Sequence, residues 1–304
     1  MSSRILVAAG VAIIIVLGGV VYLLRGDSAK LPETASVGPS PTLPEPTKRP
    51  IPTIDIAPAK GWPEGAKPTP ASGLAVNAFA TGLSHPRWLY VLPNGDVLVA
   101  ESNGPERPDD AKGLKGIVFR MAQKRAGAGV PSANRITLLR PDGNGAATKT
   151  IFLENLSSPF GMALVGNDLY VATTDSVIRF AYTPGAPRID SPGVKLADLP
   201  AGPLNPHGTT NVIASRDGSK LFATVGSNSN AAENGLDKEE NRAAILLIDR
   251  ASGQWRVFAS GLRNPNGMGF EPQTGALWTV ANERDELGSD LVPDYLTSVK
   301  DGAF

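Results

Sequence analysis

From Leu74 onward, apolar and polar positions follow a pattern that recurs four times along the chain. Each copy contains a proline, a short apolar run, a turn rich in Asn, Asp or Gly, and a second apolar run; the copies cover residues 83–100, 156–172, 204–224 and 262–281. The prolines at positions 86, 159, 206 and 265 lie 73, 47 and 59 residues apart. Repeats of roughly 40–50 residues made of short strands are typical of β-propeller blades. The pattern therefore predicts an all-β propeller over residues 74–304.

The turns between the paired apolar runs are suited to hairpins. Asn94-Gly95, Asn167-Asp168 and Asp217-Gly218 are pairs that readily adopt the positive φ angles of tight turns. A single blade cannot bury its own faces, so we expect the blades to pack against one another in chain order. The long first interval holds a charged, glycine-rich stretch from Pro105 to Ser132, which we interpret as an insertion loop.

The first 73 residues do not follow this pattern. Ile5 to Leu24 are uncharged and about as long as a helix that crosses a bilayer, so residues 1–30 are predicted to be an N-terminal transmembrane anchor. The alternative is a cleaved signal peptide, which has a shorter apolar core and a small-residue cleavage site. Residues 31–73 are rich in proline, which removes backbone donors and predicts an extended linker without helix or sheet.

Composition narrows the possible functions. Twenty-nine basic and 29 acidic residues give zero net charge, which argues against nucleic acid as the main partner. The sequence contains no cysteine, so disulfides, thiolate nucleophiles and Cys-ligated metals are excluded. It contains two histidines, His85 and His207, too few for a multi-histidine metal site. A bound cation would therefore be a hard one with oxygen ligands.

Residues at the same offset in each repeat should converge on the channel axis, where propellers bind ligands. His207 precedes the apolar strand of the third repeat and is followed by Gly208. A histidine titrates near neutrality and can take a proton from an alcohol or a hydrated aldehyde. The alternative is a histidine that caps its loop by hydrogen bonding. His85 directly precedes its proline, and we interpret it as structural.

Two further segments could bind ligands. Residues 261–267 contain Arg263, whose planar donors suit carboxylate or quinone oxygens, and two amides, Asn264 and Asn266. The alternative is a turn whose asparagines satisfy the backbone. Residues 282–290 are dense in oxygen ligands and could hold Ca²⁺. The alternative there is a solvated charged loop.

Together, three motifs resemble the glucose/sorbosone dehydrogenase family, closest to its sorbosone dehydrogenase branch. They are Asn-Pro-His-Gly at 205–208, Gly-Leu-Arg-Asn-Pro-Asn-Gly at 261–267 and Asn-Glu-Arg-Asp-Glu-Leu-Gly at 282–288. The resemblance covers most of residues 75–304. It implies a six-bladed propeller with pyrroloquinoline quinone (PQQ) and Ca²⁺ at the channel mouth. About four blades are expected here, because the chain stops where the family usually continues with a Tyr-Gly-Trp-Pro stretch; the resemblance thus implies C-terminal truncation.

The resemblance also implies roles for individual residues. His207 is similar to the catalytic base, and Arg263 and Asn264 to residues that contact the quinone, while Asn266 stands where related glucose enzymes carry Gln. Residues 283 and 284 align with the family's calcium loop, so the backbone carbonyls of Glu283 and Arg284 are the expected calcium ligands. The Gly-Pro that the glucose enzymes have near this point is missing here.

The implied activity is PQQ-dependent oxidation of an aldose or aldosone by hydride transfer to the quinone, with His207 as general base. The expected partners are a small sugar, the membrane through the N-terminal helix, and a respiratory or other electron acceptor. The expected location is the bacterial inner membrane, crossed once, with the propeller in the periplasm. Alternatives are a non-catalytic propeller that binds a sugar or a protein, an inactive fragment, and a Ca²⁺-assisted lactonase. The lactonase would need several converging carboxylates, which the repeats do not offer.

Overall fold

The computed structural model describes residues 3–24, 26–47, 56–104, 113–202 and 205–304. The chain divides into two compact units. The propeller unit comprises Ala57–Asn282 and Tyr295–Phe304, and the N-terminal unit comprises Met1–Ile56 and Glu283–Asp294. The predicted boundaries after residues 30 and 73 stay predictions.

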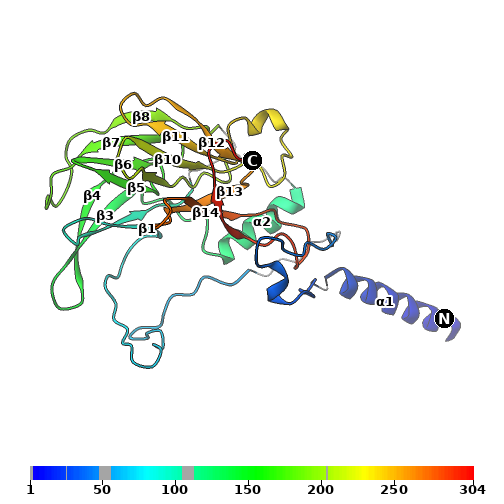
Figure 1. Cartoon of the computed structure of the whole chain (residues 1–304). Coiled ribbons are helices and arrows are strands. Elements are labelled where there is room, and N and C mark those ends of the chain that lie inside the picture. The colour runs from blue at the N-terminus through cyan, green and yellow to red at the C-terminus, as the bar shows by residue number, and fades with distance from the viewer. Residues whose placement is uncertain (1–2, 25, 48–55, 105–112, 203–204) are drawn as a thin grey trace. The chain divides into compact units, whose positions relative to one another are not determined.

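The propeller unit contains four antiparallel sheets that follow one another in chain order, from cyan to red in Figure 1. This confirms the predicted all-β, propeller-like fold with four blades; the total of six blades stays a prediction. Blade 1 comprises β1 (Pro86–Val91), β2 (Val97–Glu101), β3 (Arg135–Pro141) and β4 (Ala147–Leu153). Blade 2 comprises β5 (Met162–Val165), β6 (Asp168–Ala172), β7 (Ser176–Ala181) and β8 (Val194–Asp198). Blade 3 comprises β9 (Val212–Ala214), β10 (Lys220–Val225), β11 (Ala244–Asp249) and β12 (Trp255–Ser260), and blade 4 comprises β13 (Asn264–Phe270), β14 (Leu277–Asn282) and β15 (Tyr295–Val299).

Two of the three predicted turn pairs carry the positive φ angle of a first hairpin. Between β1 and β2 the positive φ of 86° falls on Gly95, and between β9 and β10 the φ of 69° falls on Gly218, as predicted. Between β5 and β6 the positive φ of 59° falls on Gly166 and not on the predicted Asn167-Asp168 pair. Glycine adopts this conformation at the lowest steric cost, so it takes the strained position when it is within reach.

Apolar side chains pack between successive blades. One cluster joins blades 1 and 2 and includes Leu98, Ile136 and Met162, and a second joins blades 2 and 3 through Tyr170 and Leu246. In blades 1 to 3 most buried side chains lie on the second and third strands of the sheet. Each core therefore belongs to two blades at once, as the repeat pattern requires.

The seam between blades 3 and 4 is built around one aromatic side chain. Phe222 on β10 is buried and contacts Phe258 and Phe270 edge-on, with ring centroids 5.1 and 5.4 Å apart. Phe258 belongs to blade 3 and Phe270 to blade 4. Edge-to-face pairs add about 0.5–1.5 kcal/mol each beyond the burial of their area. Phe222 therefore stabilises the interface between blades 3 and 4, which carry most of the predicted site.

The insertion after β2 is not only a loop. It contains helix α2 (Gly113–Arg125), which the sequence analysis did not predict. Two glycines within the helix lower its helix propensity, so the sequence pattern does not predict a helix here. Lys124 and Arg125 in the last turn favour the helix, because cations interact well with the negative end of the helix dipole.

The N-terminal unit contains helix α1 (Ser3–Leu24) and a 3₁₀ turn, η1 (Glu33–Ser36). Within the part of the chain that the structure describes, no helix has both the length and the hydropathy for crossing a membrane, so the predicted anchor is not supported. The turn η1 also corrects the expectation that the proline-rich linker is without helical structure.

The rest of the N-terminal unit joins two distant segments. The Asp290 carboxylate accepts hydrogen bonds from the backbone N–H groups of Lys30 and Leu31, at 2.8–3.0 Å and 3.0 Å. Thr47 N–H donates to the carbonyl of Leu287 at 2.9 Å. Part of the proline-rich segment is therefore tied to the loop between β14 and β15.

Candidate functional site

Two sets of loops lie at the same end of every blade, because the strands are antiparallel. One set enters the first strand of each blade, and the other joins the second strand to the third. Hydrogen bonds link the two sets: Ser102 Oγ, after β2, donates to the Pro159 carbonyl, before β5, at 2.6 Å. The predicted site residues of the propeller unit all lie on these loops or on the strand ends beside them.

His207 lies in the loop that enters blade 3, and its imidazole is fixed by the loop between β10 and β11. Its Nδ1 lies 3.1 Å from the Ser227 carbonyl and 2.9 Å from Ser227 Oγ. A carbonyl oxygen only accepts, and Ser227 Oγ already donates to the Ser229 carbonyl at 2.7 Å. These partners require the proton on Nδ1. In the neutral imidazole the basic lone pair is then on Nε2.

Arg263 is half-buried at the entry to blade 4, with its guanidinium held by neighbouring loops. Its Nε donates to the Asn230 carbonyl at 3.1 Å, and Nη2 donates to Asn230 Oδ1 at 2.8 Å. Nη1 donates to the Asn282 carbonyl at 3.3 Å. Asn266 Nδ2 lies 3.3 Å from Asn282 Oδ1. The guanidinium plane therefore has a defined orientation before any ligand binds.

His207 and Asn264 meet at Gly226. A Cβ on Gly226 would clash with His207 Cβ and would lie 2.8 Å from Asn264 Oδ1, so only glycine fits between them. Asn264 Oδ1 is buried and has no hydrogen-bond partner among the described residues. An unpaired buried acceptor costs about 1–3 kcal/mol, which a ligand that donates a hydrogen bond would recover. The structure thus brings together the predicted base and an unsatisfied amide.

Two other unpaired polar atoms occur in loops at this end of the blades. Thr174 Oγ1, after β6, and Asn211 Nδ2, before β9, are buried without a partner in the described part of the chain. The Gly208 position next to His207 approaches Thr174, since a Cβ there would lie 3.0 Å from Thr174 Cγ2. Unpaired groups are therefore concentrated on the face that carries His207.

Arg87 is a residue that the sequence analysis did not select, although it lies at the same offset as His207 within its repeat. Its Nη2 donates to Thr209 Oγ1 at 2.9 Å, and its Cζ lies 5.1 Å from the centre of the Phe160 ring. Burial lowers the pKa of Arg87, and no described carboxylate pairs with it. A desolvated cation without a counter-ion is well suited to an anionic ligand.

The predicted calcium ligands lie in the N-terminal unit. Glu283 N–H donates to Asp294 Oδ1 at 2.8 Å, and Arg284 follows it in the same loop. Among the residues with described positions, no group of three or more His, Asp or Glu side chains could hold a metal. Backbone carbonyls, which are the predicted ligands, are not part of that criterion, so the calcium assignment stays a prediction.

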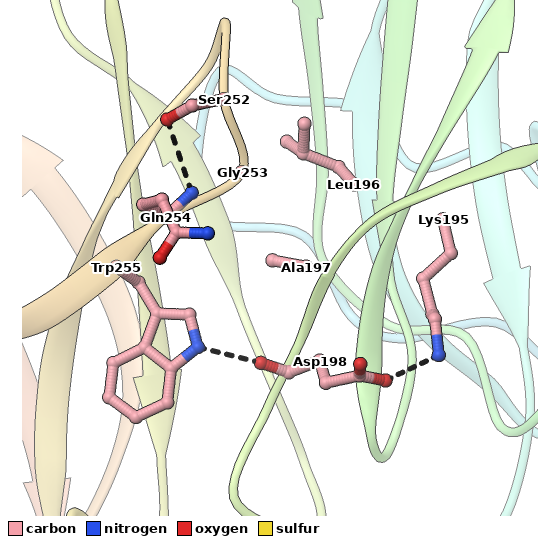
Figure 2. Close-up of a pocket in the computed structure, with 8 residues that line it drawn as sticks. All are labelled: Lys195, Leu196, Ala197, Asp198, Ser252, Gly253, Gln254 and Trp255. Atoms are coloured by element: carbon pink, nitrogen blue, oxygen red, sulfur yellow. Dashed lines mark hydrogen bonds and ion pairs between the residues drawn. The ribbon is translucent and has the colours of Figure 1, made fainter.

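A cavity of about 550 Å³ lies elsewhere, between the outer parts of blades 2 and 3 (Figure 2). It lies between β8 and the β11–β12 turn, where Trp255 Nε1 donates to the Asp198 carbonyl at 2.9 Å. Lys195 pairs with the Asp198 carboxylate at 2.5 Å. None of the predicted site residues lines this cavity, so the unsatisfied groups beside His207 mark the better site.

Comparison with solved structures identifies the fold. The PQQ domain of pyranose dehydrogenase from Coprinopsis cinerea, in its holo form, is 18% identical over 73% of this chain and 52% of that one, with a TM-score of 0.54. A family AA12 carbohydrate-active enzyme from Trichoderma reesei is 19% identical over 77% and 56%, with a TM-score of 0.57. An oxidoreductase from Thermus thermophilus, described as a glucose dehydrogenase, is 23% identical over 76% and 67%, with a TM-score of 0.52. The chain spans about half the length of the first two proteins.

Sequence comparison identifies the family. No curated protein matches the chain. The profile of the TrAA12-like family matches residues 126–294, which include His207, Arg263 and Asn264 and make up more than half of the 304 residues. The chain therefore belongs to the TrAA12-like family.

Proposed function

We propose that this protein is a PQQ-dependent sugar dehydrogenase that oxidises an aldose or aldosone, with His207 as general base. The observation that carries the proposal is the pairing of His207 with the unsatisfied Asn264 Oδ1 across Gly226. This oxygen is buried, so a sugar hydroxyl would donate a hydrogen bond to it after a shift of the Asn264 side chain. The fold is shared with the PQQ domain of pyranose dehydrogenase, which supports the same class of reaction.

The residues present fit the quinone. Pyrroloquinoline quinone carries three carboxylates and two quinone oxygens, all of which accept hydrogen bonds. Arg87 and Arg263 provide two guanidinium groups on this face, and planar donors of this kind suit carboxylate oxygens. When bound, the quinone supplies a two-electron acceptor for the hydride that leaves the sugar carbon. Asn266, beside Asn264, provides a further amide for the same ligands.

The chain's own residues handle the proton. His207 holds its proton on Nδ1, so Nε2 is the atom that takes the hydroxyl proton of the substrate. Loss of that proton and of a hydride from the same carbon–oxygen unit converts an aldose to its lactone. A general base of this kind contributes about 10²–10⁴-fold in rate. Arg263, already oriented by Asn230, stabilises negative charge on an oxygen placed beside it.

The proposal also includes a calcium site. We place Ca²⁺ at the backbone carbonyls of Glu283 and Arg284, and the calcium structure of the Trichoderma reesei protein supports this choice of ion. The sorbosone-type substrate, the respiratory acceptor and the periplasmic location stay predictions.

The test is substitution of His207 by Ala, with His85→Ala as control. His85 Nδ1 contacts the Ser102 carbonyl at 2.7 Å, so the control removes the chain's other histidine from a comparable contact. His207→Ala should lower sugar-dependent dye reduction by about 10²–10⁴-fold and leave quinone binding nearly unchanged. Arg263→Ala should instead weaken quinone binding, because a charged donor is lost. Near-normal turnover in His207→Ala at saturating quinone and Ca²⁺ would favour a non-catalytic sugar-binding propeller.

A further inference from the structure

We propose that Arg242 is a positioning residue for His207, which it holds in the Nδ1–H tautomer through the Ser227 carbonyl. Arg242 precedes β11 and is only 5% exposed. Burial lowers its pKa, and no carboxylate in the described part of the chain forms an ion pair with it. This inference rests on the proposed role of His207 as base.

The guanidinium of Arg242 donates to oxygens of the two loops that surround His207. In the loop that carries His207 it donates to the Ala201 carbonyl and to Asn205 Oδ1. In the loop between β10 and β11, Nε donates to the Gly226 carbonyl at 3.0 Å, and Nη2 lies 3.4 Å from the Ser227 carbonyl. The buried Arg242 side chain therefore holds the loop that carries His207 and the loop that contacts its imidazole.

Ser227 is the point at which these contacts reach the imidazole. The Ser227 carbonyl oxygen accepts from His207 Nδ1 and from the Arg242 guanidinium, so both of its lone pairs are occupied. Its own N–H donates to the Arg263 carbonyl at 2.8 Å, which fixes the peptide on its other side. Movement of this carbonyl would change which imidazole nitrogen carries the proton.

The positive charge of Arg242 is not sufficient for this positioning role. A lysine in place of Arg242 would keep the positive charge, but its ammonium cannot span four oxygens in the fixed geometry of a guanidinium. The loops would then lose their common donor, and His207 would be free to adopt the Nε2–H tautomer, which an unrestrained neutral imidazole favours. In that form Nε2 has no lone pair for the substrate proton.

The matched control lies at the other end of the same strand. Arg250 follows β11, and its Nε donates to the Gly218 carbonyl at 2.6 Å. Arg250→Lys is therefore the same chemical change, on the same blade, away from His207. The tautomer is measured by imidazole ¹⁵N NMR of the full chain at a pH where histidine is neutral. The chain has two histidines, so a His85→Gln variant assigns both signals.

We expect wild-type His207 to show a protonated Nδ1, and Arg242→Lys to show a mixed or reversed tautomer. His85 should stay unchanged in both proteins. With quinone bound, kcat should fall by about 10²-fold in Arg242→Lys, the scale of an ångström-sized misplacement, while KM for the sugar changes little. Arg250→Lys should match the wild type in both measurements.

An Nε2–H tautomer in the wild type would overturn the proposal, and so would an unchanged His207 signal in folded Arg242→Lys. Circular dichroism during thermal unfolding establishes that each variant is folded. If Arg242→Lys does not fold, the wild-type tautomer alone decides. If the wild type oxidises no sugar but the tautomer responds to Arg242, the proposed function fails and the positioning role stands.

Discussion

The Gly226→Ala variant tests the geometry of the site with a single added methyl group. Its Cβ would clash with His207 Cβ and would lie 2.6 Å from the His207 carbonyl oxygen, about 1 Å short of ordinary van der Waals contact. The backbone atoms of a loop tied to Arg242 cannot simply rotate away. His207 or the strand end must therefore shift by an amount close to that shortfall.

The magnitude follows from this shift. A misplacement of about 1 Å in a catalytic group can lower the rate about 10²-fold, which corresponds to about 2.7 kcal/mol of transition-state stabilisation. Overpacking of a well-packed site also costs about 1–3 kcal/mol of folding free energy. We therefore expect Gly226→Ala to lose about two orders of magnitude in kcat/KM and to unfold at a lower temperature.

The matched control is Gly269→Ala on β13. Neither glycine has a positive φ, and a Cβ on Gly269 meets nothing within 4 Å, so the two variants differ in the space around the methyl group. Sugar-dependent dye reduction and thermal unfolding are measured for both. If Gly226→Ala is as active and as stable as Gly269→Ala, His207 does not lie against Gly226 and the described site is wrong.

Three other expectations concern stability and cofactor affinity. Phe222→Ala should lower the free energy of unfolding by about 3–5 kcal/mol in urea titrations, because the seam between blades 3 and 4 loses its central ring; an effect below about 1 kcal/mol would contradict that packing. Burial raises the pKa of Glu101, but hydrogen bonds from Arg135, Thr137 and Ser84 outweigh this and lower it below its usual 4.5. Its stabilising effect is therefore present above about pH 4.5 and lost as the pH falls through the lowered pKa, so Glu101→Gln should flatten the acid limb of unfolding; an unchanged acid limb counts against the network. Arg87→Met should weaken quinone binding in a fluorescence titration and leave unfolding nearly unchanged; equal affinity would remove Arg87 from the site.

The repeat pattern was sufficient to predict the four blades and to bring His207 and Asn264 to the same end of the fold. Position within the repeat carries this information, because equivalent loops of a propeller must converge. The pattern places Arg87 at the same offset as His207, but it could not show that the guanidinium is desolvated, since its partner Thr209 is 122 residues away. Arg242 could not be identified for the same reason: its four acceptors come from two loops that lie 15 to 41 residues before it in the chain.

Elements outside the repeat were predicted less well. The sequence predicts a loop where helix α2 forms, because the two glycines of the helix and the basic residues along it give no amphipathic signal. The N-terminal apolar run does form helix α1, but among the described residues no helix has the length and hydropathy to cross a membrane. The charged stretch after Asn282 forms a loop, and the calcium ligands expected in it stay a prediction. Its pairing with the Lys30 segment could not be inferred from composition.

The site is divided between blades 3 and 4, so separation of these two blades alone is sufficient to disrupt it. His207 enters blade 3 and Asn264 begins blade 4, and Phe222 closes the seam between them. In repeat arrays one unit can open locally while the remaining units stay folded. Detachment of blade 4 alone would erase the binding surface and leave blades 1 to 3 intact. Heat inactivation should then precede the loss of bulk β-structure, and amides of β13 and β14 should exchange with deuterium faster than those of β6.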